Sequence, residues 1–366
     1  TCALSGKWHL GDSVRQQHGF TKWYTIGMGG CCYYHPDIVE NGDIKVEHGR
    51  YVTELITDKA LDWLKELAGQ EAPFYLSVHY TAPHSPWGEE HHPAKWIDYY
   101  RDCAFESIPD IPDHPDMTTG PVYGTPKRRE NLIGYFAAVS AMDEQVGRIL
   151  DWLVEFGMER DTIVIFTADN GMSMGQHGIW GKGNGTFPLN MYDTAVKVPF
   201  LISWPGHIRG GSLCDELVSA YDLFPTIMEL TGIEYGGDGK RCGSSFAALL
   251  MEKTGRKTEE IVVFDEYGPV RMIRTKEWKY VHRYPYGRNE LYNLLSDPGE
   301  MENLYEDPHC KDVVIKMRER LEVWFERWRE EDQDGVRQGV TGAGQMCPAG
   351  KRADRVNIYA PIELFF

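Results

Sequence analysis

Helix-type and buried-strand patterns alternate along this chain, and the alternation constrains its fold more than any other feature. Residues 50–68 and 130–156 carry apolar side chains at helical spacing. Residues 162–167 (TIVIFT) and 198–203 (VPFLIS) are instead short, continuous apolar runs, which are typical of strands covered on both faces. The alternation therefore predicts an α/β fold whose sheet is covered by helices on both faces.

The pattern changes near residue 255. Beyond it, three short strand candidates are joined by tight connections and followed by an amphipathic helix over about 309–330. We expect an antiparallel meander with a helix, and hence two domains, residues 1–255 and a smaller α+β subdomain with a tail, residues 256–366. The tail from Asp332 is polar and Gly-rich, and we expect it to be poorly ordered. The strand candidates are 261–266, 271–274 and 279–283.

Composition excludes two classes of protein. The formal net charge is −17, so the chain lacks the basic surface that a nucleic-acid binder needs. No apolar run reaches the ~18 residues of a membrane span, so we expect no transmembrane segment. The eight cysteines form no Cys-x-x-Cys pair and leave disulfides open. No targeting segment is visible, and the oligomeric state is open as well.

The first cluster of chemically active residues is at the start of the chain, in GKWHLG. Lys7 and His9 are two residues apart, so on an extended segment both side chains point to one face. A cation beside an imidazole suits an anionic oxygen and a proton transfer. Taken alone, the pair is better explained as a surface lysine and a hydrogen-bonded histidine.

Two further clusters each follow a predicted strand. His84 lies between two prolines after the strand over 73–80, so its imidazole has a fixed direction. Asp169 and Asn170 follow the run 162–167 and offer two hard oxygen ligands, which suit Ca²⁺ or Mg²⁺. The alternatives are loop packing for His84 and a simple Asp-Asn-Gly turn.

The last cluster is the Gly-rich stretch GQHGIWGKGNG, which contains His177 and Lys182. Glycines permit close approach of the backbone to a ligand. Asp193 is the only acid between residues 171 and 210, so this part of an acidic chain is locally positive, which favours an anionic substrate. A flexible loop is the alternative interpretation. The basic residues of that range are Lys182, Lys197 and Arg209.

The order of these motifs resembles the sulfatase family of the alkaline-phosphatase superfamily. GKWHLG, APHSP, TADNG and GQHGIWGKG are similar to its successive signature blocks, and the resemblance spans nearly the whole chain. It implies an alkaline-phosphatase-like, mostly parallel sheet and hydrolysis of a sulfate monoester. The substrate would be a sulfated glycan or small aryl ester, as in bacterial relatives.

The resemblance also implies roles for matching residues. Lys7 would contact the sulfate and the nucleophile, and His9 would be the base that collapses the covalent intermediate. His84 would bind sulfate and protonate the leaving oxygen, while Lys182 would bind sulfate near the leaving group. His177 would line the substrate pocket.

A divalent metal and a modified nucleophile complete the expected chemistry. Asp169 and Asn170 would ligate the metal, which is Ca²⁺ in most relatives, with Mg²⁺ as the alternative. The nucleophile would be a formylglycine made within a Cys/Ser-x-Pro/Ala-x-Arg motif upstream of GKWHLG. None of the eight cysteines lies in such a motif, and Cys347 comes nearest.

Only six residues precede Lys7, which leads to three interpretations. The favoured one is the C-terminal majority of a sulfatase whose N-terminal segment, with the formylglycine, is missing; this chain alone would then be inactive. The alternatives are a truncated protein that only binds sulfated ligands and a phosphate or phosphonate ester hydrolase. A periplasmic or secreted location is preferred to a cytoplasmic one.

Overall fold

The structure, a computed structural model, describes residues 1–329 and 336 except for a few short gaps: 235, 237–238, 253–257, 266–269 and 285–286. The predictions for the tail from Asp332, for Cys347 and for the last residue of the strand 261–266 fall outside the described residues. Contacts divide the chain into two compact units. The described residues of the first are 1–107 and 121–158, and those of the second come from Ile108–Gly120 and Glu159–Val340. The predicted domain boundary at residue 255 falls inside the second unit and stays a prediction.

The first unit contains a five-stranded mixed sheet. Its order is β4-β3-β2-β1-β5, with β1 parallel to β2 and to β5. Strand β3 is antiparallel to both β2 and β4. The Asn41–Gly42 turn, with φ of 55° and 87°, joins β3 to β4 as a tight hairpin. The strands are β1 (Cys2–Gly6), β2 (Lys22–Ile26), β3 (Asp37–Glu40), β4 (Asp43–Val46) and β5 (Tyr75–His79).

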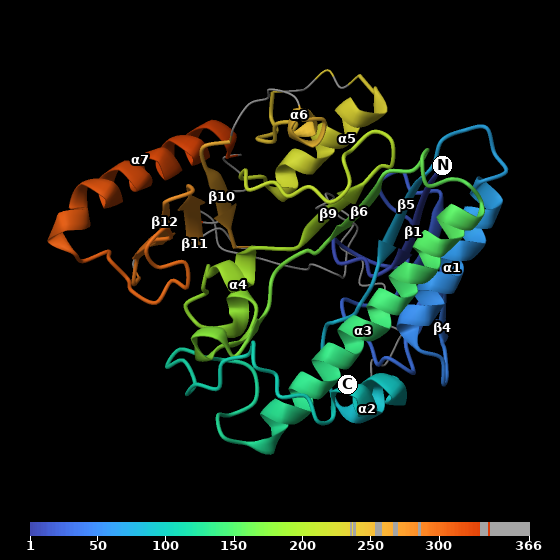
Figure 1. The fold of residues 1–366 in the computed structure, drawn as a ribbon, viewed down its shortest axis with the longest axis horizontal. Coiled ribbons are helices and arrows are strands. Elements are labelled where there is room, and N and C mark those ends of the chain that lie inside the picture. The colour runs from blue at the N-terminus through green and yellow to red at the C-terminus, as the bar shows by residue number, and fades with distance from the viewer. Residues whose placement is uncertain are drawn as a thin grey trace. The chain divides into compact units, whose positions relative to one another are not determined.

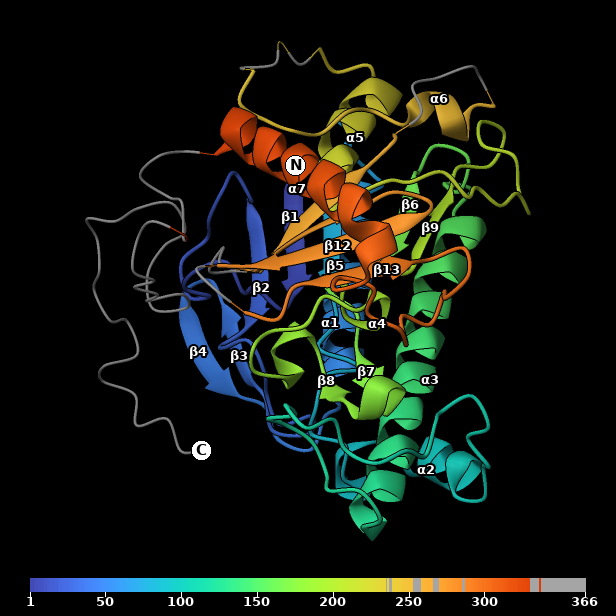
Figure 2. The ribbon, with the colours of Figure 1, turned by 90° about the vertical axis from the view of Figure 1, so that its left-hand side faces the viewer.

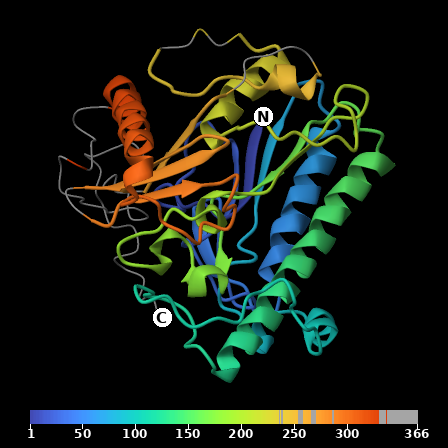
Figure 3. The ribbon, with the colours of Figure 1, turned by 60° about the vertical axis from the view of Figure 1, so that its left-hand side comes forward.

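Helix α1 (Val52–Leu67) covers one face of this sheet, and α3 (Pro126–Glu155) packs along α1 (Figures 1 and 3). The helices predicted over 50–68 and 130–156 are confirmed, as is the strand over 73–80. Helix α3 starts four residues earlier than expected, at Pro126, since proline is favourable in the first turn of a helix. The short α2 (Ala94–Tyr100) packs on α3.

The opposite face of the sheet is covered by the loop after β1. Trp8 from this loop packs with Leu4, Trp23 and Val39. Side chains alternate between the two faces along β1: Leu4 faces this cluster, whereas the Ser5 hydroxyl donates to the backbone oxygen of Ile56 on α1 at 2.8 Å. In this unit the loop therefore takes the place of the helix that we expected on the second face.

The second unit begins with a two-stranded sheet. Strands β6 (Val164–Thr167) and β9 (Phe200–Ser203) confirm the two predicted apolar strands and pair antiparallel. Most of their residues are half-buried rather than fully covered. Between them, β7 (Ser173–Met174) and β8 (Trp180–Gly181) form a small hairpin. Helix α5 (Leu223–Thr231) follows, preceded by one 3₁₀ turn.

The predicted meander and amphipathic helix are also confirmed in this unit. Strands β10 to β13 pair antiparallel in sequence order, and α7 (Lys311–Trp328) packs across them (Figure 2). The other face of the sheet contributes Met272 and Val281 to a cluster with Met191. The strands are β10 (Ile261–Phe264), β11 (Val270–Arg274), β12 (Trp278–Arg283) and β13 (Glu290–Asn293). The remaining helices are α4 (Asp193–Val196) and α6 (Ala247–Leu250), with 3₁₀ turns at Glu89–His91, Gln176–Gly178, Gly183–Gly185, Ala220–Asp222 and Pro308–Cys310.

No helix in the described part of the chain has both the length and the apolar character to cross a membrane.

Candidate active site

Lys7 lies directly after β1, and His79 is the last residue of the parallel strand β5. The Lys7 amide donates to the His79 backbone oxygen at 2.7 Å, and the His79 Nδ1 lies 3.0 Å from the Lys7 backbone oxygen. Lys7 is half-buried, and His9, two residues on, is exposed. Carboxyl ends of parallel strands are where α/β proteins place their sites. Sequence reasoning missed His79, although its position at the end of the predicted strand was a usable signal.

The loop after β5 fixes the direction of His84. The His84 Nδ1 lies 2.9 Å from the backbone oxygen of Ser85, and the Tyr33 hydroxyl donates to the His84 backbone oxygen at 2.7 Å. A carbonyl next to Nδ1 requires the proton on that nitrogen in the neutral ring, which leaves Nε2 as the basic atom. The His84 Cε1 is 3.9 Å from where a Cβ on Gly30 would be, so the loop after β2 lies beside the imidazole.

His92 supports this loop from behind. Its Nε2 lies 3.0 Å from the backbone oxygen of Pro86, two residues after His84, and its Nδ1 lies 3.1 Å from the hydroxyl of buried Tyr51. The neutral ring satisfies both contacts, with Nε2 donating and Nδ1 accepting. Burial lowers the pKa of His92 to about 4, despite the hydrogen bond to Pro86, which raises it.

Cys31, in the loop after β2, is a thiol that interacts with Lys7. Its sulfur lies 3.9 Å from the Thr81 hydroxyl, and the charge of Lys7 acts on it. Burial nevertheless raises the pKa of the Cys31 thiol to about 12, and the Thr81 hydrogen bond and Lys7 offset this only partly. Cys31 is therefore a protonated thiol at neutral pH and not a reactive thiolate.

In the second unit, Asp169 and Asn170 follow β6, as predicted. The next residue, Gly171, donates its amide to the Ala195 backbone oxygen at 2.8 Å, and a Cβ there would be 2.2 Å from the Thr194 backbone oxygen. Only glycine permits this approach. Asp169 is exposed and Asn170 half-buried.

Lys182 is held by Asn190. The Asn190 Nδ2 donates to the backbone oxygens of Lys182 and Gly183, each at 3.1 Å. Asn190 is itself buried, while Lys182 is half-buried. The sidechain amide of Asn190 therefore fixes the backbone from which the Lys182 ammonium extends.

His177 occupies a left-handed backbone conformation, with φ of 57°, between Gly175 and Gly178. Its imidazole stacks on the ring of Tyr192, with centroids 3.8 Å apart and planes 11° from parallel. Burial lowers the pKa of His177, and the charges of His114 and Lys279 lower it further, against the smaller opposite effect of Asp297.

One stretch of chain, residues 190–195, therefore contacts Lys182, His177 and Gly171, the residue that follows Asp169 and Asn170; we call it the anchor segment. Asn190 binds the Lys182 backbone, Tyr192 stacks on His177, and Thr194 and Ala195 hold the turn after Asn170. The structure thus brings the second unit's predicted residues onto a common support, and those of the first unit to the end of β1 and the loop after β5.

The anchor segment rests on a buried charge cluster. The fully buried Lys279 on β12 donates to the Met191 backbone oxygen at 3.0 Å and lies 2.5 Å from carboxylate oxygens of Asp193 and of Glu300. Arg274 adds a second ion pair with Asp193 at 3.3 Å. The attraction of Lys279 and Arg274 outweighs burial and lowers the pKa of Asp193, whereas burial raises that of Glu300.

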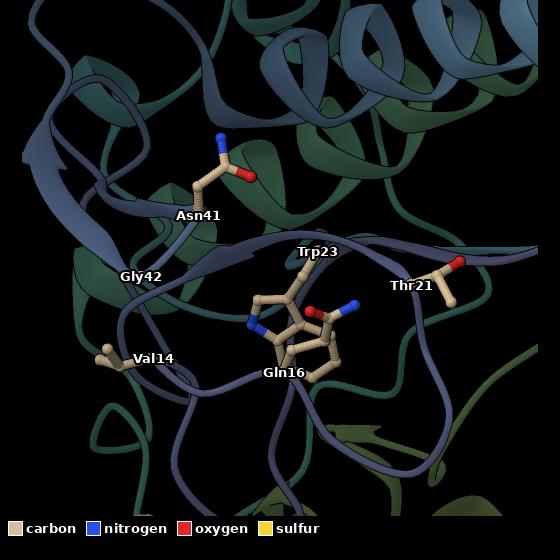
Figure 4. A pocket seen from close by; sticks show the side chains of 6 residues that line it. All are labelled: Val14, Gln16, Thr21, Trp23, Asn41 and Gly42. Atoms are coloured by element: carbon tan, nitrogen blue, oxygen red, sulfur yellow. The ribbon is translucent and has the colours of Figure 1, made fainter.

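A cavity of about 250 Å³ in the first unit lies away from these residues (Figure 4). It is lined by Trp23 at the start of β2 and by Asn41 and Gly42 of the β3–β4 turn, together with Val14, Gln16 and Thr21. Lys7 lies at the opposite, carboxyl end of the parallel strands. This cavity is therefore not part of the candidate site.

The sulfatase family model matches residues 2–233, which is more than half of the chain. The chain belongs to the sulfatase family. A second model, the C-terminal part of N-sulphoglucosamine sulphohydrolase, matches residues 175–327 of this sulfatase. The matched ranges include every candidate residue.

Curated relatives and a solved structure agree with this assignment. The chain is 26% identical to an N-acetylglucosamine-6-O-sulfatase of Bacteroides thetaiotaomicron, over 91% of this chain and 71% of that protein. It is 27% identical to an ulvan-active sulfatase of Formosa agariphila, over 87% of this chain but only 62% of that protein. A sulfatase solved in complex with its substrate D-glucosamine-2-N,6-O-disulfate is similar with a TM-score of 0.76 and 23% identity, covering 91% of this chain and 81% of that one.

The fold is alkaline-phosphatase-like α/β, with a central mixed sheet, helices and a separate antiparallel sheet. The family match and the named homologues support sulfate ester hydrolysis on glycans or aryl groups. Members of the family use a metal ion and a formylglycine. Asp169 and Asn170 fit such a metal as part of an oxygen-ligand set, since both are accessible and the Asn170 amide nitrogen donates to Gly171, which leaves the side-chain oxygen to ligate. Among the described residues, no three His, Cys, Asp or Glu side chains cluster as a metal site.

Proposed function

We propose that the whole protein hydrolyses sulfate monoesters carried by a sugar. One observation carries the proposal. The residues matched by the sulfatase family model include polar side chains that are exposed or half-buried, and hydrogen bonds of the neighbouring backbone hold them in place. Lys7 and His84 are held at the carboxyl end of β1 and after β5, while Lys182 and the Asp169–Asn170 pair are held by the anchor segment. These groups are the cations, imidazole and oxygen ligands that sulfate transfer needs.

Each residue has a task that suits its chemistry. The ammonium groups of Lys7 and Lys182 would stabilise negative charge on the sulfuryl oxygens. His84, as the imidazolium, would give its Nε2 proton to the leaving oxygen and become neutral with the remaining proton on Nδ1, which faces the Ser85 carbonyl. His9, which is exposed beyond Lys7, would act as the base that releases sulfate. The formylglycine of the family supplies the nucleophile when present.

The metal proposed at Asp169 and Asn170 is Ca²⁺. Ca²⁺ takes six to eight oxygen ligands and accepts a carboxylate beside an amide oxygen, whereas Mg²⁺ demands a stricter octahedron. In the Asp169→Ala variant, addition of millimolar Ca²⁺ should no longer raise the melting temperature, while the Asp161→Ala variant should respond like the wild type. Asp161 is an exposed acid three residues before the start of β6 at Val164, so it controls for the loss of one negative charge.

The proposed substrate is a sulfated glycan rather than a simple aryl ester. This rests on the relatives, whose names specify N-acetylglucosamine 6-O-sulfate and ulvan. The test is release of sulfate by protein expressed from the whole coding sequence together with a formylglycine-generating enzyme. We expect release from N-acetylglucosamine 6-sulfate to exceed release from nitrophenyl sulfate. Hydrolysis of phenyl phosphonate or phosphate esters alone would refute the proposal.

A further inference from the structure

A strap formed by residues 108–120 packs against the Gly-rich stretch that contains His177 and Lys182. The His114 amide donates to the Gly178 backbone oxygen at 3.0 Å, and the Thr118 amide donates to the Gly185 backbone oxygen at 2.9 Å. A Cβ on Gly178 would be 2.2 Å from the Pro112 backbone oxygen, so strap and stretch touch at the backbone.

This contact places His114 beside His177. The backbone of His114 is hydrogen-bonded to Gly178, the residue that follows His177, and both imidazoles are half-buried. The His114 Nδ1 accepts a hydrogen bond from the Asp116 amide at 3.1 Å. In the neutral ring the proton is therefore on Nε2, which makes the outer nitrogen of His114 a donor.

His177 has a fixed orientation of its own. The parallel stack on Tyr192 leaves only the ring edges for hydrogen bonds. Burial lowers the pKa of His177 and favours its neutral form, in which one nitrogen donates and the other accepts; the interaction with His114 and the charge of Lys279 lower this pKa further, and Asp297 has the opposite, smaller effect. The acids of the strap near His114 are Asp113 and Asp116, and Asp116 is 3.7 Å from Arg288.

We propose that His114 and His177 form one subsite, oriented by Tyr192, that hydrogen-bonds hydroxyl groups of the substrate's sugar ring. A hydroxyl both donates and accepts, so it matches the outer nitrogen of His114, whose Nδ1 already accepts from the Asp116 amide, beside the ring edge of His177. Tyr192 is a positioning residue, since it acts through His177. The inference rests on the proposed function for the identity of the ligand as a sugar.

The test measures binding of unsulfated sugars to the full chain, which needs no sulfate chemistry. The probes are N-acetylglucosamine, N-acetylgalactosamine and galactose. Their binding is detected by saturation-transfer NMR and quantified by calorimetric titration. We expect the wild type to bind at least one of them. The variants His114→Asn and His177→Asn should each weaken that binding about tenfold or more, as loss of a hydrogen bond to a buried ligand does.

These substitutions spare the local structure. Asparagine at 114 still offers an acceptor to the Asp116 amide but lacks the outer nitrogen, and asparagine tolerates the left-handed conformation at 177. Tyr192→Phe should keep the stack and bind like the wild type, whereas Tyr192→Leu should weaken binding as His177→Asn does. His207, which stacks on Trp204 at 3.8 Å in the same unit, is the matched control, and His207→Ala should have no effect.

Two results would overturn the inference: no binding of any probe by the wild type, or wild-type affinity in both His114→Asn and His177→Asn. If sulfate release from a sulfated sugar is observed alongside either result, the proposed function stands and only the subsite fails. If sugar binding depends on both histidines but no sulfate ester is hydrolysed, the proposed function fails instead.

Discussion

The backbone oxygen of His79 lies 1.9 Å from the position that a Cβ on Gly6 would occupy. Gly6 also has a φ of 119°, a conformation that side-chain-bearing residues rarely adopt. The close approach allows the Lys7 amide to reach the His79 carbonyl at 2.7 Å, so this glycine fixes Lys7 at the end of β1.

We therefore expect Gly6→Ala to destabilise the protein by about 3 kcal/mol, from the strained φ and the forced separation of β1 and β5. The measurement is chemical unfolding at pH 7. Gly19 is the control, because it has a φ of 82° and nothing within 4 Å of its Cβ position, so Gly19→Ala should cost only about 1 kcal/mol. Equal losses in the two variants would show that the contact with His79 is unimportant.

Acid should weaken the protein through His92. Its pKa is lowered by burial to about 4 in the folded state, below the ~6.5 of an unfolded chain, so the unfolded state takes up the proton first as pH falls. Neutral His92 contributes fully to the free energy of unfolding above pH ~6.5. As pH falls towards 4, this free energy decreases by about 3 kcal/mol. Comparing unfolding free energies at pH 7 and 4.5, we expect His92→Gln to show the shallower loss and exposed His35→Gln to match the wild type.

Removing the cation of the buried cluster should be costly. Lys279→Met leaves Asp193 and Glu300 without their shared partner, and breaking a buried pair in this way costs about 3–5 kcal/mol. Arg318→Met removes an exposed ion pair with Glu322 and should cost less than about 1 kcal/mol. Urea unfolding of the two variants gives the comparison, and a similar small cost in both would contradict a stabilising role for Lys279.

In the active sulfatase, we expect Lys7→Ala, His84→Ala and Lys182→Ala each to lower kcat about 10²-fold or more, as loss of one electrostatic stabiliser does. Steady-state sulfate release is the readout, with circular dichroism to confirm folding. The exposed Lys197 is the matched cation outside the proposed roles, and Lys197→Ala should keep kcat within a factor of about two. A rate unchanged in any of the three would remove that residue from the mechanism.

Periodicity was sufficient for the elements that bury a continuous apolar face. Local patterns predicted several elements, because the spacing of the apolar residues in each is visible in the sequence. These elements are helices α1, α3 and α7 and strands β5, β6 and β9. Strand β1 has no such signal. It is five residues long, ends in a glycine, and buries Ser5 through a hydrogen bond to Ile56, 51 positions away.

The residues that hold the candidate side chains in position could not be predicted from the sequence either. Asn190 and Tyr192 carry no chemistry that a motif search would select, and their roles follow from contacts with Lys182 and His177 that only the folded chain creates. His114 lies among prolines and aspartates that favour a turn, which is indeed what its Nδ1 stabilises. The residues with proposed chemical roles can thus be recognised in the sequence, whereas the residues that hold them in position depend on tertiary contacts.

Because the anchor segment supports several candidate residues of the second unit, their positions depend on one another. A substitution at Asn190, Tyr192 or Thr194 would disturb a loop shared by a cation, an imidazole and an oxygen-ligand turn. The strap is hydrogen-bonded to the Gly-rich stretch and to Phe187, and its Asp116 pairs with Arg288. If the proposed sugar subsite is correct, exchanges in the strap should change which sugars bind while the turn after Asn170 keeps its support. Laboratory evolution towards new glycans would accumulate its successful changes between residues 108 and 120 and leave residues 190–195 untouched.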